Sequence, residues 1–397
     1  MKISRRNFLA VAGAAAAAAA LTACGGSSAS SASTASSAAA STASSAAEGG
    51  EKIVKVALTC DTGTIDDESF NQACWTAVSG YMGDNCQYYI PEADASDEDR
   101  ETMIRQAVND GADVIVCVGY LYGASLAWAA DQYPDVKFIA IDVTQFDIGT
   151  DTIPANCYCI TFKEEQAGYL AGYAITKDGK TKLGFLGGMA VPAVIRYGYG
   201  FVQGVDAAAA DLGLTDVSLN YVYGGQFFGD ADITAVMDTW YAGGTEVVFA
   251  CGGGIYTSAV DAAKKVGAKV IGVDVDQAGV IAGYAGVEGM TVTSAMKGLY
   301  PTTYDTLTDV IVNGNWDAYK GKIATLGLVS GDDPELNYVQ IPMGEGTQWS
   351  DSFTQDDYKA MVKDMFDGKI TVSNDVSKTP SDFATVIAVE DQGAIKG

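Results

Sequence analysis

The chain has 397 residues and a formal net charge of −26, from 50 Asp and Glu against 24 Lys and Arg, and it contains no His. This acidity argues against nucleic acid or anionic lipid as a partner, because both are bound by basic surfaces. The lack of His removes the commonest general acid and base near neutral pH.

Residues 1–23 have the pattern of an export signal, in which a basic start is followed by an alanine-rich apolar run. Within it, Ser4-Arg-Arg-Asn-Phe-Leu9 resembles a twin-arginine signal, and Leu21-Thr-Ala-Cys24 resembles a bacterial lipobox. We therefore predict that cleavage leaves Cys24 as a lipid-bearing first residue and that the protein is held outside the cytoplasmic membrane. An ordinary secretory peptide that ends near a cysteine is the alternative.

Residues 24–50 are nearly all Ser, Ala, Thr and Gly. A segment of this composition cannot bury a core, and it is predicted to be a flexible, lipidated tether that holds a globular part away from the membrane. The globular part, residues 51–397, is long enough for two lobes with substantial cores. No apolar run within it is long enough to span a membrane.

The first predicted strand, the apolar run Ile53–Leu58, is followed by a polar turn and then by a helical pattern. Open α/β sheets bind ligands in the crevice beyond the carboxyl ends of such strands, which the first N–H groups of the helix also face. Asp61 and Asn71 would give that crevice polar contacts, and Phe70 would give it a flat apolar face.

Two other interpretations of this turn stay open. Thr64 and Asp67 fit a capping box, in which case the turn only begins a helix. Asp61 with Asp66 and Asp67 also partly resembles the calcium loop of nucleoside hydrolases, but Gly63 replaces one of the carboxylates of that loop. A hard cation needs about six to eight oxygen ligands, so this replacement weakens the hypothesis of a metal site.

Strand and helix signals alternate through most of the globular part. Apolar runs occur at Ile53–Leu58, Val114–Val118, Phe138–Ile141, Leu183–Leu186, Val247–Ala250 and Val270–Val273, separated by amphipathic stretches such as Asp99–Val108, Ile233–Tyr241 and Ser258–Val266. Continuous apolar strands with intervening helices predict an α/β fold with parallel sheets covered on both faces.

The rhythm of these signals predicts two α/β lobes, the first at residues 51–160 and the second at residues 161–287. Residues 288–397 are less regular and are predicted to return and complete both lobes. They contain a predicted helix at Tyr304–Val312, a strand near Ile323–Val329 and an apolar run at Thr385–Val389.

Seven cysteines follow Cys24, and their spacing fits neither a zinc site nor a redox motif. They are Cys60, Cys74, Cys86, Cys117, Cys157, Cys159 and Cys251. Most lie in apolar runs, so we predict that they are small buried hydrophobic residues. We predict no metal and no cofactor.

Seven motifs follow one another between Ile53 and Gly298. They are Asp66-Asp-Glu-Ser-Phe-Asn-Gln72, Asp135-Val-Lys-Phe-Ile-Ala-Ile-Asp142, Glu165-Gln-Ala-Gly-Tyr-Leu-Ala-Gly172, Lys182-Leu-Gly-Phe-Leu-Gly-Gly188 with Gly200-Phe-Val-Gln-Gly204, Gly225-Gln-Phe-Phe-Gly-Asp230, Ile271-Gly-Val-Asp-Val-Asp-Gln277 and Thr293-Ser-Ala-Met-Lys297. Together they resemble the basic membrane protein family of lipoproteins, which includes the purine-nucleoside receptors of ABC importers. The resemblance implies a type I periplasmic-binding-protein fold, with two doubly wound parallel-sheet lobes and a ligand cleft between them.

The resemblance also implies roles for individual residues. The implied ligand-binding residues are Asp61, Phe70, Asn71, Asp142, Phe227, Gly253, Asp274 and Lys297. The two phenylalanines would sandwich a flat base, and Asp274 with Lys297 would form a polar end for the ribose. The motif around Phe227 has one extra residue, so Phe228 could take its place. Lys297 could instead be a solvated lysine at the start of a helix.

These implications predict the extracellular substrate-binding lipoprotein of an ABC importer, without chemistry of its own. It would bind a nucleoside, of the purine type, as a monomer, and it would work with separate permease and ATPase subunits. A pentose-type sugar receptor of the same fold is one alternative, and a metal-dependent nucleoside hydrolase is another. A receptor that senses its ligand without import would differ only in its partner.

Overall fold

The computed structural model describes residues 54–92 and 95–396, which belong to one compact unit, Ile53–Gly397. The predictions for the export signal, for Cys24 and for the tether lie outside the described residues. Within the described residues, every helix is too short or too polar to cross a membrane.

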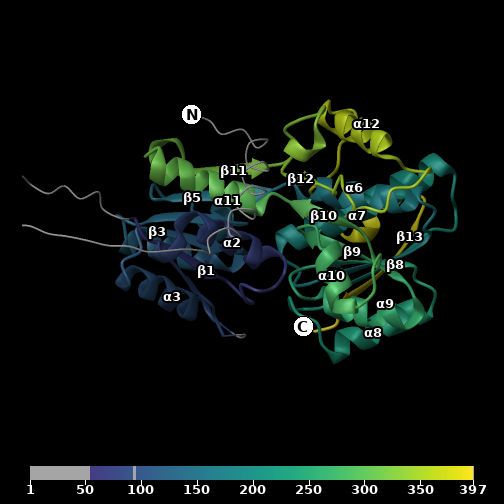
Figure 1. Ribbon diagram of the computed structural model, residues 1–397, viewed down its shortest axis with the longest axis horizontal. Coiled ribbons are helices and arrows are strands. Elements are labelled where there is room, and N and C mark those ends of the chain that lie inside the picture. Colours follow the sequence, from purple (N-terminus) through teal and green to yellow (C-terminus); the bar gives the residue numbers. More distant parts are fainter. Residues whose placement is uncertain (1–53, 93–94, 397) are drawn as a thin grey trace, which may run out of the picture. The chain divides into compact units, whose positions relative to one another are not determined.

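The first sheet has six parallel strands in the order β11-β5-β4-β3-β1-β2 (Figure 1). The strands are β1 (Val56–Cys60), β2 (Cys86–Tyr89), β3 (Val114–Val118), β4 (Lys137–Ile141), β5 (Cys157–Phe162) and β11 (Lys322–Leu326). The accompanying helices are α2 (Phe70–Met82), α3 (Asp97–Asn109), α4 (Gly123–Gln132), α5 (Gln145–Ile148) and α11 (Leu299–Leu307). We call this sheet and these helices the first lobe. The strand order reverses between β1 and β3, the point at which open α/β sheets bind ligands.

The second sheet has seven strands in the order β12-β10-β9-β8-β6-β7-β13, and only β12 is antiparallel to its neighbour. The strands are β6 (Lys182–Gly187), β7 (Ser218–Tyr223), β8 (Val247–Cys251), β9 (Lys269–Asp274), β10 (Thr291–Lys297), β12 (Val339–Gln340) and β13 (Ala388–Ala394). The helices are α6 (Glu164–Lys177), α7 (Pro192–Leu212), α8 (Ala231–Ala242), α9 (Tyr256–Val266), α10 (Ala278–Ala285) and α12 (Gln355–Phe366). This second lobe has the same reversal of strand order, here between β6 and β8.

Short helical turns connect these elements. They are the 3-10 turns at Gly83–Asn85, Tyr120–Tyr122, Trp316–Ala318, Pro334–Leu336 and Pro380–Phe383, and a π-helical turn at Thr308–Val312 that extends α11.

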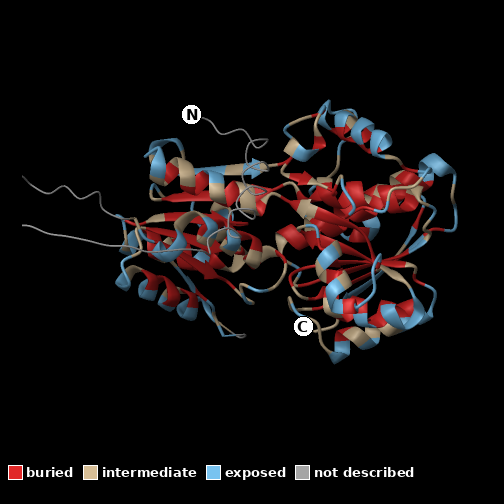
Figure 2. Ribbon diagram, viewed as in Figure 1, coloured by how far each residue is buried: buried red, intermediate tan, exposed pale blue. Residues whose placement is uncertain are grey.

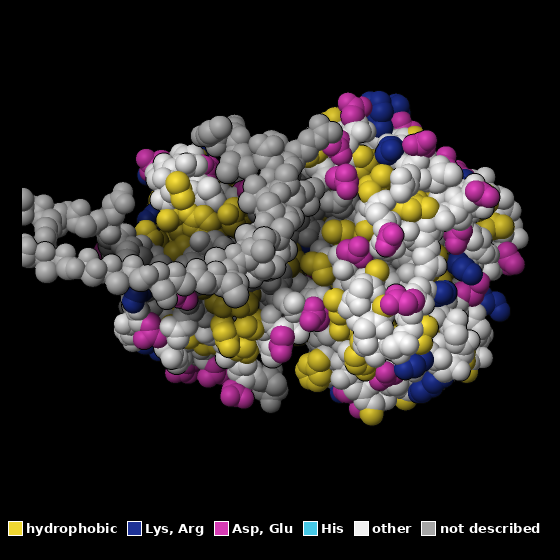
Figure 3. All heavy atoms as spheres, viewed as in Figure 1, with side chains coloured by type: hydrophobic (Ala, Val, Ile, Leu, Met, Phe, Trp, Pro, Cys, Tyr) yellow, Lys and Arg dark blue, Asp and Glu magenta, His cyan; other side chains and the backbone are white. Residues whose placement is uncertain are grey.

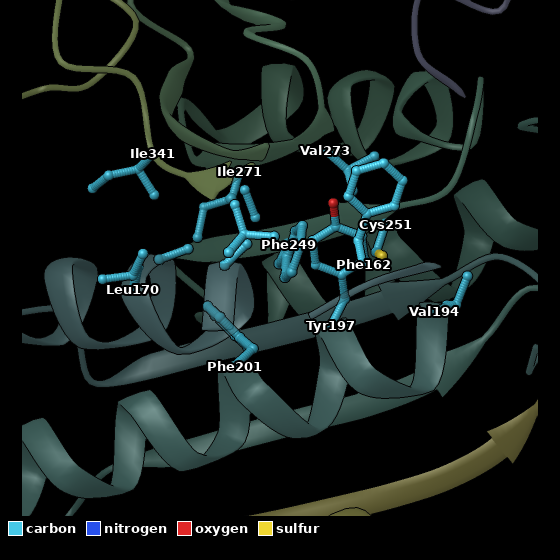
Figure 4. Packing of buried hydrophobic residues seen from close by; sticks show 14 of the residues in the cluster. Phe162, Leu170, Val194, Tyr197, Phe201, Phe249, Cys251, Ile271, Val273 and Ile341 are labelled. Atoms are coloured by element: carbon cyan, nitrogen blue, oxygen red, sulfur yellow. The ribbon is translucent and has the colours of Figure 1, made fainter. Parts of the chain in front are cut away.

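The core of the second lobe depends on an unusually close approach of helices α6 and α7. A Cβ atom on Gly168 would lie 2.1 Å from the carbonyl oxygen of Tyr197, and one on Gly204 would lie 2.2 Å from that of Tyr169. Only glycine fits at such contacts, so these positions fix the distance between the two helices. Buried side chains then fill the space between the helices and the sheet (Figures 2 and 4).

The predicted α/β class is confirmed, with mostly parallel sheets in both lobes. The predicted strand Ile53–Leu58 lies two to three residues too early, because β1 is Val56–Cys60. Strands β2 and β7 were not predicted, since each has exposed or half-exposed positions that break the apolar run. Strands from the segment 288–397 join both sheets. The exact lobe boundaries stay a prediction.

The seven described cysteines are all free thiols. Six of them are buried, and Cys86 is partly exposed. The six buried cysteines therefore act as small core residues, as predicted, whereas Cys86 does not.

Candidate functional site

A pocket of about 720 Å³, including the part open to solvent, lies at the carboxyl ends of strands from both sheets. Its lining includes all eight predicted residues, Asp61, Phe70, Asn71, Asp142, Phe227, Gly253, Asp274 and Lys297. The sequence therefore predicted residues that the fold brings together from distant parts of the chain.

Asp61 directly follows β1 and is buried, with 7% of its surface exposed. Its Oδ2 accepts a hydrogen bond from the backbone N–H of Leu121 at 2.9 Å. The loop that carries Leu121 can come this close because Gly119, with φ 117°, lacks a side chain: a Cβ there would lie 2.1 Å from the Asp61 carboxyl group. Burial raises the pKa of Asp61 to about 7, although the hydrogen bond from Leu121 and the charge of Arg100 oppose the rise.

Asp67 caps helix α2, but not in the predicted way. The prediction of a capping box between Thr64 and Asp67 is wrong, because the helix begins only at Phe70. The Asp67 carboxylate instead accepts the backbone N–H groups of Ser69, Asn71 and Gln72, each at 3.0 Å. Both of its oxygens are thus used to hold the start of the helix.

Asn71 lies in the first turn of α2 and is buried. Its Nδ2 donates to the backbone oxygen of Thr62 at 2.9 Å, while its Oδ1 is buried without a hydrogen-bond partner. A buried acceptor without a partner is costly, and a ligand donor would remove that cost.

Asp142 directly follows β4 in the first lobe, and Asp274 ends the equivalent strand, β9, in the second. Both have left-handed backbone conformations, with φ of 62° and 65°. Residues other than glycine rarely adopt such φ values. A backbone conformation of this kind persists where the surrounding structure enforces it, often at a functional site. Here the conformation belongs to two strand-end carboxylates that line the pocket.

Lys297 ends β10, and its side chain is 3% exposed, so the interpretation as a solvated lysine is wrong. Its Nζ lies 2.6 Å from Asp142 Oδ2, 3.5 Å from Glu164 Oε1 and 3.9 Å from Asp274 Oδ1. Since Asp142 belongs to the first lobe and Asp274 to the second, one ammonium group connects the carboxylates of both. Its Nζ also lies 4.5 Å from the ring centroid of Phe70, a cation–π contact.

Glu164 and Arg196 complete the charged cluster, and the sequence analysis missed both. Glu164 is fully buried at the start of α6, and its Oε2 accepts from Arg196 Nε at 2.6 Å. It is absent from the pocket lining, and Lys163 separates it from the end of β5, so neither a motif nor a strand-end position marked it in the sequence.

The two aromatic side chains of the predicted sandwich come from different lobes. Phe70 begins α2, and Phe227 follows β7. Phe227 lines the pocket, whereas Phe228 is outside the lining and 53% exposed. Stacking of Phe227 on a ligand stays a prediction. Gly252 makes room for the Phe227 ring, because a Cβ there would lie 2.8 Å from Cδ1 of that ring.

Two hydrogen bonds connect the loops of the two lobes beside the pocket. Ser69 Oγ donates to Asp274 Oδ2 at 2.8 Å, and Gln277 Nε2 donates to the backbone oxygen of Glu68 at 3.0 Å. Tyr197 rises from α7 toward Cys251 and Val273 at the pocket floor, and its hydroxyl lies 3.4 Å from Asp274 Oδ1 (Figure 4). Asp274 is thus held by donors from both lobes.

The lining carries more acid than base. Its charged residues are Asp61, Asp67, Asp142, Asp274 and Lys297. Burial raises the pKa of Asp142 to about 6, and the ammonium group of Lys297 opposes this rise. Burial also raises the pKa of Asp67 to about 6. Such a pocket suits a ligand rich in hydrogen-bond donors.

The arrangement gives no support to a metal site. No group of three or more His, Cys, Asp or Glu within residues 54–92 and 95–396 is placed to hold a metal ion. The turn that resembled a calcium loop uses both oxygens of Asp67 for backbone N–H groups instead.

A sequence profile of the family described as ABC transporter substrate-binding protein PnrA-like matches residues 53–332. The chain belongs to this family. Its members are substrate-binding proteins of transporters rather than enzymes, so the protein works with a small-molecule substrate and with the other transporter subunits. A profile of twin-arginine translocation signal sequences matches residues 2–22, which indicates a location outside the cytoplasm.

Two relatives illustrate the relationship. The ABC transporter nucleoside-binding protein BmpA of Lactococcus lactis is 27% identical over 338 residues, which cover 80% of this chain and 89% of the relative. Basic membrane protein A of Borreliella burgdorferi is 32% identical over 235 residues, which cover 58% of this chain and 66% of the relative.

Solved structures confirm the type I periplasmic-binding-protein fold. A solute-binding protein of an ABC transporter system from Aeropyrum pernix superposes with a TM-score of 0.61 at 22% identity, covering 83% of this chain and 90% of the other. A solute-binding protein of an ABC transporter system from Conexibacter woesei gives a TM-score of 0.59 at 22% identity, covering 81% of this chain and 99% of the other. At this identity the similarity concerns the fold alone.

Proposed function

We propose that this PnrA-like substrate-binding protein binds purine nucleosides between its two lobes. The observation that carries the proposal is the composition of one pocket, with an aromatic side chain from each lobe and a cluster of buried carboxylates around one lysine. Aromatic faces hold nucleobases by stacking, at about 1–3 kcal/mol per base. Carboxylates accept hydrogen bonds from sugar hydroxyls, and a charged acceptor strengthens these bonds.

The buried acceptors without partners favour a ligand with several donors. Asn71 and Asp142 both line the pocket, and the Oδ1 atom of each is buried without a hydrogen-bond partner. A ribose with its hydroxyl groups, or a base with N–H groups, supplies such donors. A pentose without a base would use the carboxylates but would leave the aromatic faces of Phe70 and Phe227 without a stacked ring.

A thermal-shift experiment tests the ligand class. Adenosine, guanosine or inosine in large excess over Kd is expected to raise the melting temperature by several degrees, because a ligand that binds only the folded state stabilises it. Free ribose and xylose are expected to have little effect. A shift with ribose or xylose and none with the three nucleosides would replace the proposal by the pentose alternative.

A pair of variants controls this experiment. Phe70→Ala removes an aromatic face of the pocket, so it is expected to reduce the nucleoside shift. Phe146→Ala removes a phenylalanine that is 81% exposed and lies outside the pocket lining, and it should keep the full shift. Equal shifts in both variants would argue against base stacking on Phe70.

We further propose that lipid on Cys24 anchors the protein, which acts as a monomer with a separate permease and ATPase. Cys24→Ala is expected to move the protein from the membrane to the soluble fraction, since stable anchoring needs more than one acyl chain and the lipid is its source. Labelling with radioactive palmitate measures the modification directly. An unlabelled wild-type protein would contradict it.

A further inference from the structure

The last strand, β13, ends at the same edge of the second sheet as the pocket. It pairs in parallel with β7 from Ala388↔Ser218 to Ala394↔Tyr223. Parallel strands place their carboxyl ends at the same sheet edge, so the residues after β13 meet the loop after β7. The backbone N–H of Ile395 continues the pairing and donates to the oxygen of Tyr223 at 2.8 Å.

Lys396 then contacts the loop that carries Phe227. Its Nζ donates to Gln226 Oε1 at 3.3 Å and forms an ion pair with Asp230. Its backbone lies so close to the loop that a Cβ on Gly225 would be 2.5 Å from the Lys396 carbonyl oxygen. Gly225 has φ 81°, so glycine suits this position for its backbone conformation as well.

The residues on either side of Phe227 in the chain are held by hydrogen bonds connected to Lys396. Gln226 Nε2 donates to the backbone oxygen of Phe228 and to Asp230 Oδ2, both at 2.9 Å. On the other side of the loop, the N–H of Gly254 donates to the backbone oxygen of Phe227 at 2.8 Å. The backbone on both sides of Phe227 is therefore fixed, on one side by the glycine loop after β8 and on the other by the Lys396 network.

We infer that Lys396 is a positioning residue for ligand binding: it holds the Gly225–Asp230 loop so that the Phe227 ring stands in the pocket. It is not one of the residues that line the pocket, and it lies beyond the residues matched by the family profile. The inference rests on the proposed function, because it assumes that the Phe227 ring contacts the ligand.

Lys396→Met tests the inference, with Lys265→Met as the matched control. Lys265 pairs with Asp238 at 2.7 Å on the surface of the same lobe, away from the pocket. Titration calorimetry with adenosine is expected to give an affinity about 3-fold to 10-fold weaker for Lys396→Met, part of the effect of a stacked base. Lys265→Met should bind like the wild type. Lys396→Arg should restore most of the affinity, because it keeps the charge and the donors.

Combining Lys396→Met with Phe227→Ala shows whether Lys396 acts on ligand affinity through the Phe227 ring or by another route. There, Lys396→Met should cause no further loss, since the side chain that it positions is gone. Global stability should change little, because Lys396 and Asp230 are both partly exposed to solvent. An equal loss in both backgrounds, or none in the wild-type background, would overturn the inference.

A second measurement does not depend on the ligand. Hydrogen exchange of peptides that cover residues 224–230 should become faster in Lys396→Met and stay unchanged in Lys265→Met. Unchanged exchange in Lys396→Met overturns the inference whatever the ligand is. Faster exchange in a protein whose wild type binds no nucleoside would support the loop contact and reject the proposed function.

Discussion

Replacing Lys297 by methionine is expected to lower the free energy of unfolding by about 3–5 kcal/mol, the usual effect of removing one partner from a buried charge cluster. Methionine keeps most of the length and the apolar stem of lysine, so the change removes mainly the charge. Without the ammonium group, Asp142 and Asp274 lose their nearest positive partner, while Glu164 keeps Arg196. Unfolding in urea, followed by circular dichroism, measures the loss.

Two comparisons make this result specific. Lys265→Met breaks an exposed ion pair and should change stability little, because solvent screens it. Adding Asp142→Asn to Lys297→Met removes one of the unpaired buried charges, so it should recover part of the loss. A loss below about 1 kcal/mol for Lys297→Met would mean that the cluster is as well solvated as a surface pair.

The unliganded protein is expected to become less stable as the pH rises from 5 to 8. The pKa of Asp61 is about 7 in the folded state against 3.8 for an ordinary aspartate, so between these values the folded state binds the additional proton. Stability then falls with rising pH, because the unfolded state binds fewer protons. For Asp61 alone, the difference between pH 5 and pH 8 amounts to about 2–3 kcal/mol.

Asp61→Asn isolates this contribution from that of other groups, including the buried Asp67 and Asp142. Its stability should fall less between pH 5 and pH 8 than that of the wild type, with urea unfolding of both proteins measured at each pH. Parallel curves for the two proteins would show that Asp61 ionises in the folded state much as it does in the unfolded chain.

The parts of the fold that the sequence predicted are those in which one physical effect dominates. Strand β3 was predicted with its exact ends, because Val114–Val118 is buried on both faces and reads as an unbroken apolar run. Strand β13 has exposed residues at nearly every position, so its hydrogen bonds to β7 define it rather than its composition. The predicted apolar run Thr385–Val389 overlaps only its first two residues.

The candidate site shows the same limit. Asp61 could be predicted from its position after the first apolar strand, because the carboxyl ends of parallel strands form a binding edge. Asp142 and Asp274 were predicted from the family motifs that contain them. Glu164 could not be predicted, since its partners Arg196 and Lys297 come from α7 and β10, and only the folded chain brings them together. The role of Asp67 at the start of α2 was predicted wrongly. The spacing of Thr64 and Asp67 also fits a capping box, and the sequence alone does not show that the helix begins later, at Phe70.

The late position of strand β11 has a consequence for how the chain folds during synthesis. In β11, the hydroxyl group of Thr325 forms a 2.9 Å hydrogen bond with that of Thr161 in β5, which lies 164 residues earlier in the chain. Helix α11, which packs on α2 of the first lobe, also comes after strands β6 to β10 of the second lobe. When synthesis has just reached the end of β9, strand β5 therefore still lacks its partner β11, and helix α2 still lacks the packing of α11. A fragment of residues 51–160 would leave the edge of β5 and the face of α2 exposed. The first lobe is therefore completed only after α11 and β11 have been synthesised.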